Sequence, residues 1–122
     1  MNPVLSRAKA HYQGLERKKI LVPEWGEGGK PLLVTATALN VAERRKIYRA
    51  DAAGREPDSA MVVVRAVLLK ACDDKGKLLF DEMDEHALMY EADSMVLARI
   101  AKEILGDGGS DGDARLENAK KG

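Results

Sequence analysis

The sequence predicts an α+β protein that is mainly α-helical, with an N-terminal β-hairpin, then a bundle of about four helices and a disordered C-terminal tail. Two β-prone runs, residues 20–22 and 32–37, flank a glycine-containing loop, as in a hairpin. From residue 40 onward, apolar residues recur at helical spacing between capping residues. Residues 107–122 contain one large apolar residue, Leu116, which is too little to order the segment.

The chain has 122 residues, which corresponds to one domain. We expect a basic arm or helix at residues 1–19, a single domain at 20–106 and the tail at 107–122. Asn2 and Pro3 can open a helix in the arm, because proline at the first helical position loses no useful donor. A weak apolar stripe follows at Leu5, Ala8, Tyr12 and Leu15.

The first helix of the bundle is expected to begin at Asn40, which forms a capping box with Glu43. We expect Gly54 and Pro57 to end it. The residues expected to share one face of this helix are Val41, Tyr48 and Ala52.

The next segment, residues 61–72, is apolar on all sides, so its periodicity does not distinguish helix from strand. Its length favours a buried helix capped by Asp58 or Ser59. An acidic helix then begins within residues 81–85, with acids favourably placed near its N-terminus. Its apolar members are Met83, Leu88 and Met89.

The last helix has the most regular pattern in the chain. Asp93 or Ser94 can cap it, and Gly106 can end it. Its apolar residues follow the spacing i, i+3, i+4, i+7 and i+8, namely Leu97, Ile100, Ala101, Ile104 and Leu105.

No enzyme motif is present, and we expect a non-catalytic protein without a cofactor or a metal ion. The loop ending in Lys30 is followed by Pro31, where a phosphate-binding loop needs Ser or Thr. The single cysteine, Cys72, excludes a multi-cysteine zinc site. The acids at 81–85 resemble a solvated face, because catalytic carboxylates need a pocket that shifts their pKa values.

Charges are distributed in blocks although the formal net charge is zero. Residues 1–20 carry five basic and one acidic residue, whereas residues 80–98 carry six acids and no base. These two blocks could pair within one chain or between copies, and pairing between copies would weaken with salt. The residues proposed for this pairing are Arg17, Lys18, Lys19, Asp81, Glu82, Asp84 and Glu85.

The order of elements over residues 20–105 resembles the tail assembly chaperones of long-tailed bacteriophages. The stretches that carry the resemblance are Val22-Pro23-Glu24-Trp25-Gly26 and Gly76-Lys77-Leu78-Leu79-Phe80, together with the Arg-rich, apolar and acidic helices in that order. The resemblance implies a non-enzymatic chaperone that binds the tape measure protein, keeps it soluble and helps recruit tail tube subunits. It also implies a homo-oligomer that acts in the cytoplasm of the bacterial host and is absent from the mature virion.

Binding to an apolar helical partner suits several side chains. Methionines repack around varied partners, and a lone Trp beside a glycine loop can anchor a hairpin or a partner. The candidate partner-binding residues are Trp25, Tyr48, Met83, Met89 and Met95. The alternative for Trp25 and the methionines is a place in the core.

Two further functions remain open from the sequence. The basic N-terminal segment and the basic residues within 44–49 could contact a phosphate backbone in a nucleic-acid-associated adaptor. Neutral net charge and 4% aromatic residues make this weaker than the chaperone hypothesis. A small structural tail protein is the third hypothesis.

No apolar run is long enough for a signal peptide or a membrane span, so we expect a cytoplasmic protein.

Overall fold

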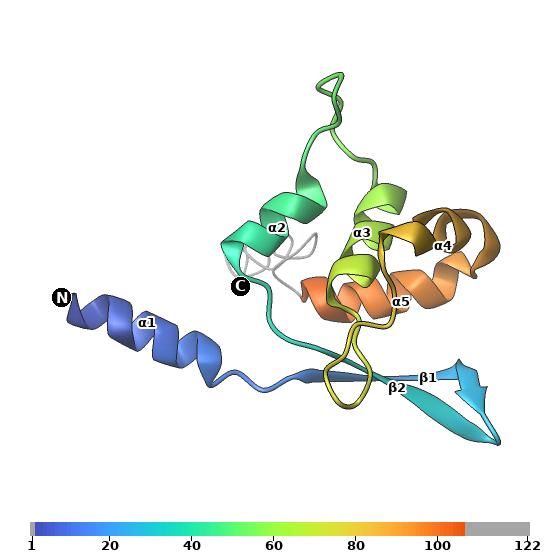
Figure 1. Ribbon diagram of the computed structural model, residues 1–122, viewed down its shortest axis with the longest axis horizontal. Coiled ribbons are helices and arrows are strands. Elements are labelled where there is room, and N and C mark those ends of the chain that lie inside the picture. The colour runs from blue at the N-terminus through green and yellow to red at the C-terminus, as the bar shows by residue number, and fades with distance from the viewer. Residues whose placement is uncertain (1, 107–122) are drawn as a thin grey trace, which may run out of the picture.

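The computed structural model describes residues 2–106, and the predicted disorder of 107–122 lies outside them. A two-stranded antiparallel hairpin lies near the N-terminus, and four α-helices follow it, as expected (Figure 1). The order of elements is α1 (Pro3–Gln13), β1 (Lys18–Glu27), β2 (Lys30–Ala36), α2 (Val41–Tyr48), α3 (Ser59–Lys70), the short 3-10 helix η1 (Glu82–Asp84), α4 (Glu85–Glu91) and α5 (Ser94–Leu105).

Helix α1 projects from the rest of the fold (Figure 1). The Asn2 side chain accepts hydrogen bonds from the backbone N–H groups of Val4 and Leu5, as the predicted cap requires. None of the residues Pro3–Gln13 is buried, so the expected apolar stripe faces solvent here. The Tyr12 hydroxyl ties the end of the helix to the domain by donating to the Ala38 carbonyl at 2.7 Å.

The hairpin begins at Lys18, two residues before the expected strand. Its register pairs Ile20 with Val34 and Val22 with Leu32, which directs alternate side chains to the core. Gly28 and Gly29 form the turn with positive φ angles of 58° and 78°, a conformation that glycine adopts without steric cost.

Helix α2 has the predicted capping box. The Asn40 side chain accepts from the Glu43 N–H at 2.8 Å, and the Glu43 carboxylate accepts from the Asn40 N–H at 3.1 Å. Its end was predicted wrongly, because the helix stops at Tyr48 and not near Gly54. The Asp51 carboxylate accepts from two backbone N–H groups of the following loop, which offers the chain an alternative to helical hydrogen bonding.

The predicted face of α2 is also wrong. Ile47 is the residue of this helix that enters the core. Val41 is 78% exposed, and Ala52 lies beyond the helix end. Tyr48 is next to Ile47 and points to a more exposed side, where 37% of its surface is accessible.

Segment 61–72 is helical over most of its length. Helix α3 is capped by Asp58, whose carboxylate accepts from the Met61 N–H, and it ends at Lys70. Cys72 lies beyond the helix and pairs with Thr35 in both directions, with N···O distances of 2.8 Å. The apolar helix is therefore joined directly to the hairpin edge.

The last positions of α3 bring a charge into the interior. Lys70 is 5% exposed, and its ammonium group lies 3.0 Å from each Glu43 carboxylate oxygen and 2.6 Å from the Thr37 hydroxyl oxygen. The three donors of the ammonium group thus have three acceptors, which is how a buried charge is tolerated.

The acidic segment begins with η1 and continues as α4. Asp81 and Asp84 form a second capping box at this start. Within α4, Leu88 is buried, as expected for an apolar member of this helix. Met83 was expected to be apolar core as well, but it lies in η1 and is 89% exposed.

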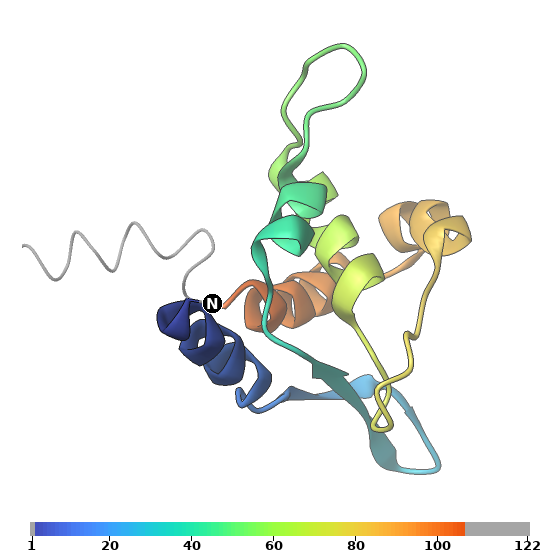
Figure 2. The ribbon, with the colours of Figure 1, turned by 60° about the vertical axis from the view of Figure 1, so that its left-hand side comes forward.

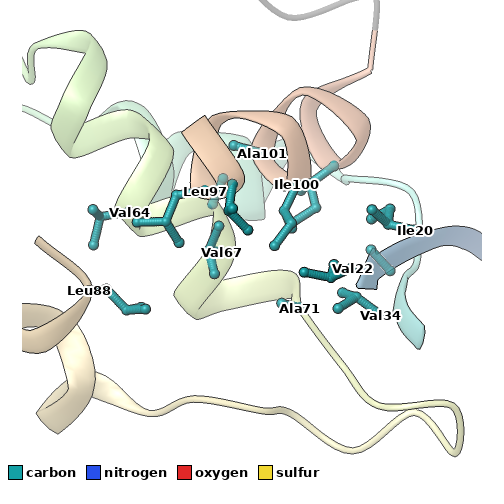
Figure 3. Close-up of a cluster of buried hydrophobic side chains, with 14 of the residues drawn as sticks. Ile20, Val22, Val34, Val64, Val67, Ala71, Leu88, Leu97, Ile100 and Ala101 are labelled. Atoms are coloured by element: carbon teal, nitrogen blue, oxygen red, sulfur yellow. The ribbon is translucent and has the colours of Figure 1, made fainter. Parts of the chain in front are cut away.

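The predicted apolar stripe of α5 faces the interior. Asp93 caps the helix by accepting from the Met95 N–H, and Gly106 ends it with φ of 68°. The hairpin side chains of the core lie against those of α3 and α5 (Figure 3). Members of this core include Ile20, Val22, Val34, Ile47, Val64, Val67, Leu88, Leu97, Ile100, Ala101 and Ile104.

Candidate protein-binding grooves

A wide bulge in β1 sets the position of Trp25. The hairpin pairing breaks after Val22 and resumes at Glu27, which leaves residues 23–26 opposite Pro31 alone. Pro23 has no N–H to donate to a ladder, so a break at this point costs no additional hydrogen bond. The strand continues through Pro23 to Glu27, beyond the β-prone run expected at residues 20–22.

Gly26 permits the return of the chain to the ladder. A Cβ atom at this position would overlap the carbonyl group of Lys30 on the opposite strand. Only glycine fits a backbone approach this close.

The bulge is tied to the last helix by a bidentate ion pair. The Arg99 guanidinium donates to the two carboxylate oxygens of Glu24 at 2.7 and 3.0 Å. These hydrogen bonds lower the pKa of Glu24 from 4.5 to about 2, and they raise the pKa of Arg99.

Trp25, held next to this pair, packs edge-to-face on Phe80. The ring centroids are 6.0 Å apart and the planes are inclined by 81°, a preferred aromatic arrangement. The two rings border a depression of about 510 Å³ between the hairpin and α4, which we call the hairpin groove. Its lining residues are Trp25, Leu32, Leu79, Phe80, Ala87, Leu88, Glu91, Ala92 and Asp93.

A second depression shares Phe80 as a lining residue with the first. It has a volume of about 740 Å³ and is formed by α2, α3 and the segment 78–85, and we call it the helical groove. Its apolar lining residues are Ile47, Met61, Leu68, Leu69, Leu78 and Phe80. Its charged lining residues are Lys46, Arg49, Arg65, Asp81, Glu82 and Glu85.

Arg65 fixes one wall of the helical groove. Its Nη1 atom donates to the Ile47 carbonyl at 3.0 Å and to the Arg49 carbonyl at 2.8 Å. These carbonyl groups end α2 without helical partners, so the guanidinium of α3 caps α2.

The candidate partner-binding residues do not form one cluster. Trp25 lines the hairpin groove and is half-buried. Met89 is half-buried and packs on the core, which fits the alternative of a structural role. Met83 and Met95 are 89% and 76% exposed, so the core alternative is wrong for both.

Two of the three basic residues proposed for charge pairing, Arg17 and Lys18, make hydrogen bonds within the fold. Arg17 donates to the Thr35 hydroxyl oxygen, with a shortest distance of 3.0 Å. Lys18 donates to the Glu103 carbonyl at 2.7 Å, at the C-terminal end of α5 where a cation is favourable. Lys19 is exposed.

The acidic residues divide into two pairs. Asp81 and Asp84 accept backbone hydrogen bonds at the start of η1, so they serve first as caps. Glu82 and Glu85 are exposed and line the helical groove.

The basic face of α2 is not a uniform cationic surface. Arg44 is half-buried, and Arg45 is exposed. Lys46 and Arg49 line the helical groove together with three carboxylates. A phosphate backbone would meet these acids as well, whereas a protein surface with mixed charges would fit them.

Several important residues had no clear signal in the sequence. Phe80 borders both grooves. Arg65 and Lys70 are the two charged side chains of the otherwise apolar helix α3. Their interruption of an apolar run is the only sequence signal that marks them.

Within residues 2–106, no group of three or more His, Cys, Asp or Glu side chains is placed to hold a metal ion. No helix in that part of the chain is long and apolar enough to cross a membrane. Comparison with protein-family models, curated proteins and solved structures gave no match.

Proposed function

We propose that this chain is a tail assembly chaperone of a long-tailed bacteriophage. In this proposal it binds the tape measure protein, keeps it soluble, helps recruit tail tube subunits and catalyses no reaction. It acts in the host cytoplasm and is absent from the finished virion. The sequence resemblance over residues 20–105 supports the family, and the helical groove supports the mode of binding.

The helical groove is the observation that carries the proposal. Its floor is apolar, with Leu68 and Leu69 half-buried and Leu78 52% exposed. A tape measure segment exposes an apolar helical stripe, and such stripes bind apolar grooves through side chains spaced by three or four residues. Burial in the groove would remove these side chains from water and so suppress aggregation.

The charged rim of the groove suits an amphipathic helix. Three cationic and three anionic side chains surround the apolar floor. Charges of both signs at a rim select orientation and partner more than they add affinity. Met83, in η1 beside the groove-lining Glu82, supplies an exposed thioether that can adapt to several successive tape measure helices.

Co-expression with the tape measure protein of the same genome tests the proposal. The wild-type chain should raise the soluble fraction of the tape measure protein and co-purify with it. Leu78→Asp places a charge on the apolar floor and should abolish this effect. Leu21→Asp is the matched control, because Leu21 is 60% exposed and lines neither groove.

A wild-type chain that forms no complex with the tape measure protein contradicts the proposal, as does equal loss in the Leu21 and Leu78 variants. Salt-sensitive DNA or RNA binding in place of that complex would favour the adaptor hypothesis. Presence of the chain in purified virions would favour a structural tail protein.

A further inference from the structure

We propose that helix α1 of one copy docks into the hairpin groove of a second copy and so joins copies head to tail. This docking is independent of what the helical groove binds. It rests on three features: an uncovered apolar face on α1, a groove of opposite charge, and the positions of the two in the fold.

Helix α1 has an apolar face that nothing in residues 2–106 covers. Val4 is 59% exposed, Leu5 is 51% exposed, and Ala8 continues the same face one turn later. A helix of 11 residues is marginal in water without such a cover, since nucleation is costly and little is gained by propagation. The face is therefore available to an apolar surface of another molecule.

The charges of the two surfaces are complementary. Helix α1 carries Arg7 and Lys9 and has no acidic residue between Pro3 and Gln13. Glu91 and Asp93 are the charged residues that line the hairpin groove. Opposite charges around an apolar contact steer association and fix its register.

The groove has the composition of a binding anchor site. Trp25 and Phe80 form one wall, and aromatic rings in a partly enclosed apolar depression are typical of residues that dominate binding energy. The small side chains of Ala87 and Ala92 line the groove too, and they leave room for larger side chains of an incoming helix.

A copy cannot place α1 in its own groove without breaking its anchors. Figures 1 and 2 both show α1 at one end of the molecule and α4 at the other. Tyr12 is hydrogen-bonded to Ala38, and Arg17 to Thr35. The four residues from Gly14 to Arg17 span at most about 14 Å, so the anchored helix docks on another molecule instead.

Contact between two different surfaces is heterologous, and it generates a ring when the rotation closes or an open chain when it does not. The expected mass of the wild-type chain therefore rises with concentration above that of the monomer. Trp25, the only tryptophan, lies in the groove, so its emission should shift to the blue as association proceeds.

A mixed-disulfide experiment tests the contact directly. Two full-length variants are prepared in a Cys72→Ala background, one with Leu5→Cys and the other with Ala87→Cys. Mixing them under mild oxidation should give a disulfide-linked heterodimer. Replacing Leu5→Cys by Leu21→Cys gives the control, because Leu21 is at least as exposed as Leu5 but lies outside the groove and α1.

Sedimentation measurements test the energetics in solution. Leu5→Asp should weaken self-association about tenfold or more, because a charge replaces an anchor side chain. The substitution leaves the fold intact, since no residue of Pro3–Gln13 is buried. Val41→Asp, at an apolar position on α2 that is even more exposed than Leu5, should leave association unchanged.

Charge reversal adds a second, independent readout. Lys9→Glu alone and Glu91→Lys alone should each weaken association, and a mixture of the two variants should restore it. Association of the wild type should also weaken as salt rises. A wild type that stays monomeric up to its solubility limit overturns the proposal, as does equal cross-linking of the Leu21 control.

The two proposals fail separately. Leu5→Asp should leave tape measure binding intact, and Leu78→Asp should leave self-association intact. Loss of tape measure binding in Leu5→Asp would place the partner on α1 and overturn the head-to-tail contact.

Discussion

The ammonium group of Lys70 lies 3.0 Å from both carboxylate oxygens of Glu43, and the Lys70 side chain is 5% exposed whereas that of Glu43 is 25% exposed. This asymmetry decides how each partner responds to the loss of the other. Glu43 retains contact with water and its bond to the Asn40 N–H, whereas Lys70 retains the Thr37 hydroxyl alone.

Removing the acid should therefore cost more than removing the base. Glu43→Ala leaves a buried ammonium group without its counter-ion and should lower the free energy of unfolding by about 3 kcal/mol. Lys70→Met keeps the volume of the side chain and should cost about 1 kcal/mol. Urea denaturation of both variants measures the difference.

The exposed pair between Arg55 and Asp51 provides the control, since Arg55→Met should leave the unfolding free energy nearly unchanged. The asymmetry argument is wrong if Lys70→Met destabilises the protein as much as Glu43→Ala.

The Glu24–Arg99 pair should give a pH dependence with a defined sign. The folded pKa of Glu24 is about 2, below its ordinary value of 4.5, so the pair stabilises the fold above pH 4.5 and this contribution is lost as pH falls toward 2. Arg99→Gln should have a lower melting temperature than the wild type at neutral pH. The difference in melting temperature between the two proteins should disappear as pH falls from 4.5 to 2, as measured by thermal unfolding followed by circular dichroism. A difference that is constant over this range would contradict the assignment to Glu24.

Gly26→Ala should be more destabilising than an alanine at the hairpin turn. Its Cβ would overlap the Lys30 carbonyl, and relief requires a backbone shift in the bulge at a cost of about 2 kcal/mol. Gly28→Ala meets no atom within 4 Å and costs about 1 kcal/mol for its positive φ. The unfolding free energies of the two variants, measured under the same conditions, test whether Gly26→Ala is the more destabilising. Equal values would show that the backbone of the bulge shifts at little cost.

Arg65→Lys should loosen the end of α2. A lysine cannot reproduce the guanidinium geometry toward the Ile47 and Arg49 carbonyl groups, and about 1 to 2 kcal/mol of stability should be lost. The loop at residues 49–57 should then be cleaved faster by a protease under native conditions. Arg45→Lys, at an exposed position of α2, should leave the cleavage rate unchanged.

Local signals are sufficient for the starts of the helices α2, α3 and α5. The capping residues Asn40, Asp58 and Asp93 act within three residues of themselves. The sequence predicts Asn40 outright, and it offers Asp58 and Asp93 as one of two neighbouring candidates each. The apolar pattern of α5 was correct because one amphipathic helix needs no knowledge of its neighbours.

Interactions between distant residues explain the errors. The end of α2 depends on Arg65, 18 residues after Ile47, and on the Asp51 loop, neither of which is visible in helix periodicity. The hairpin groove brings Trp25 and Phe80 together from segments far apart in the chain. The sequence marks Trp25 as a candidate binding residue and Phe80 only as part of the 76–80 stretch, because a partner across the fold leaves no mark on local spacing.

The two side-chain contacts between β1 and α5, Lys18 with Glu103 and Glu24 with Arg99, also govern the order in which the chain can fold. Lys18 reaches Glu103 across 85 positions and Arg99 reaches Glu24 across 75, so both contacts join the beginning of the domain to its end. The hairpin turn can close early. Val22 can pack in the same core as Ile100 only after the ribosome has synthesised the last helix. Folding of this chain is thus completed after translation of nearly the whole domain, and a nascent chain stalled before α5 exposes the apolar face of its sheet.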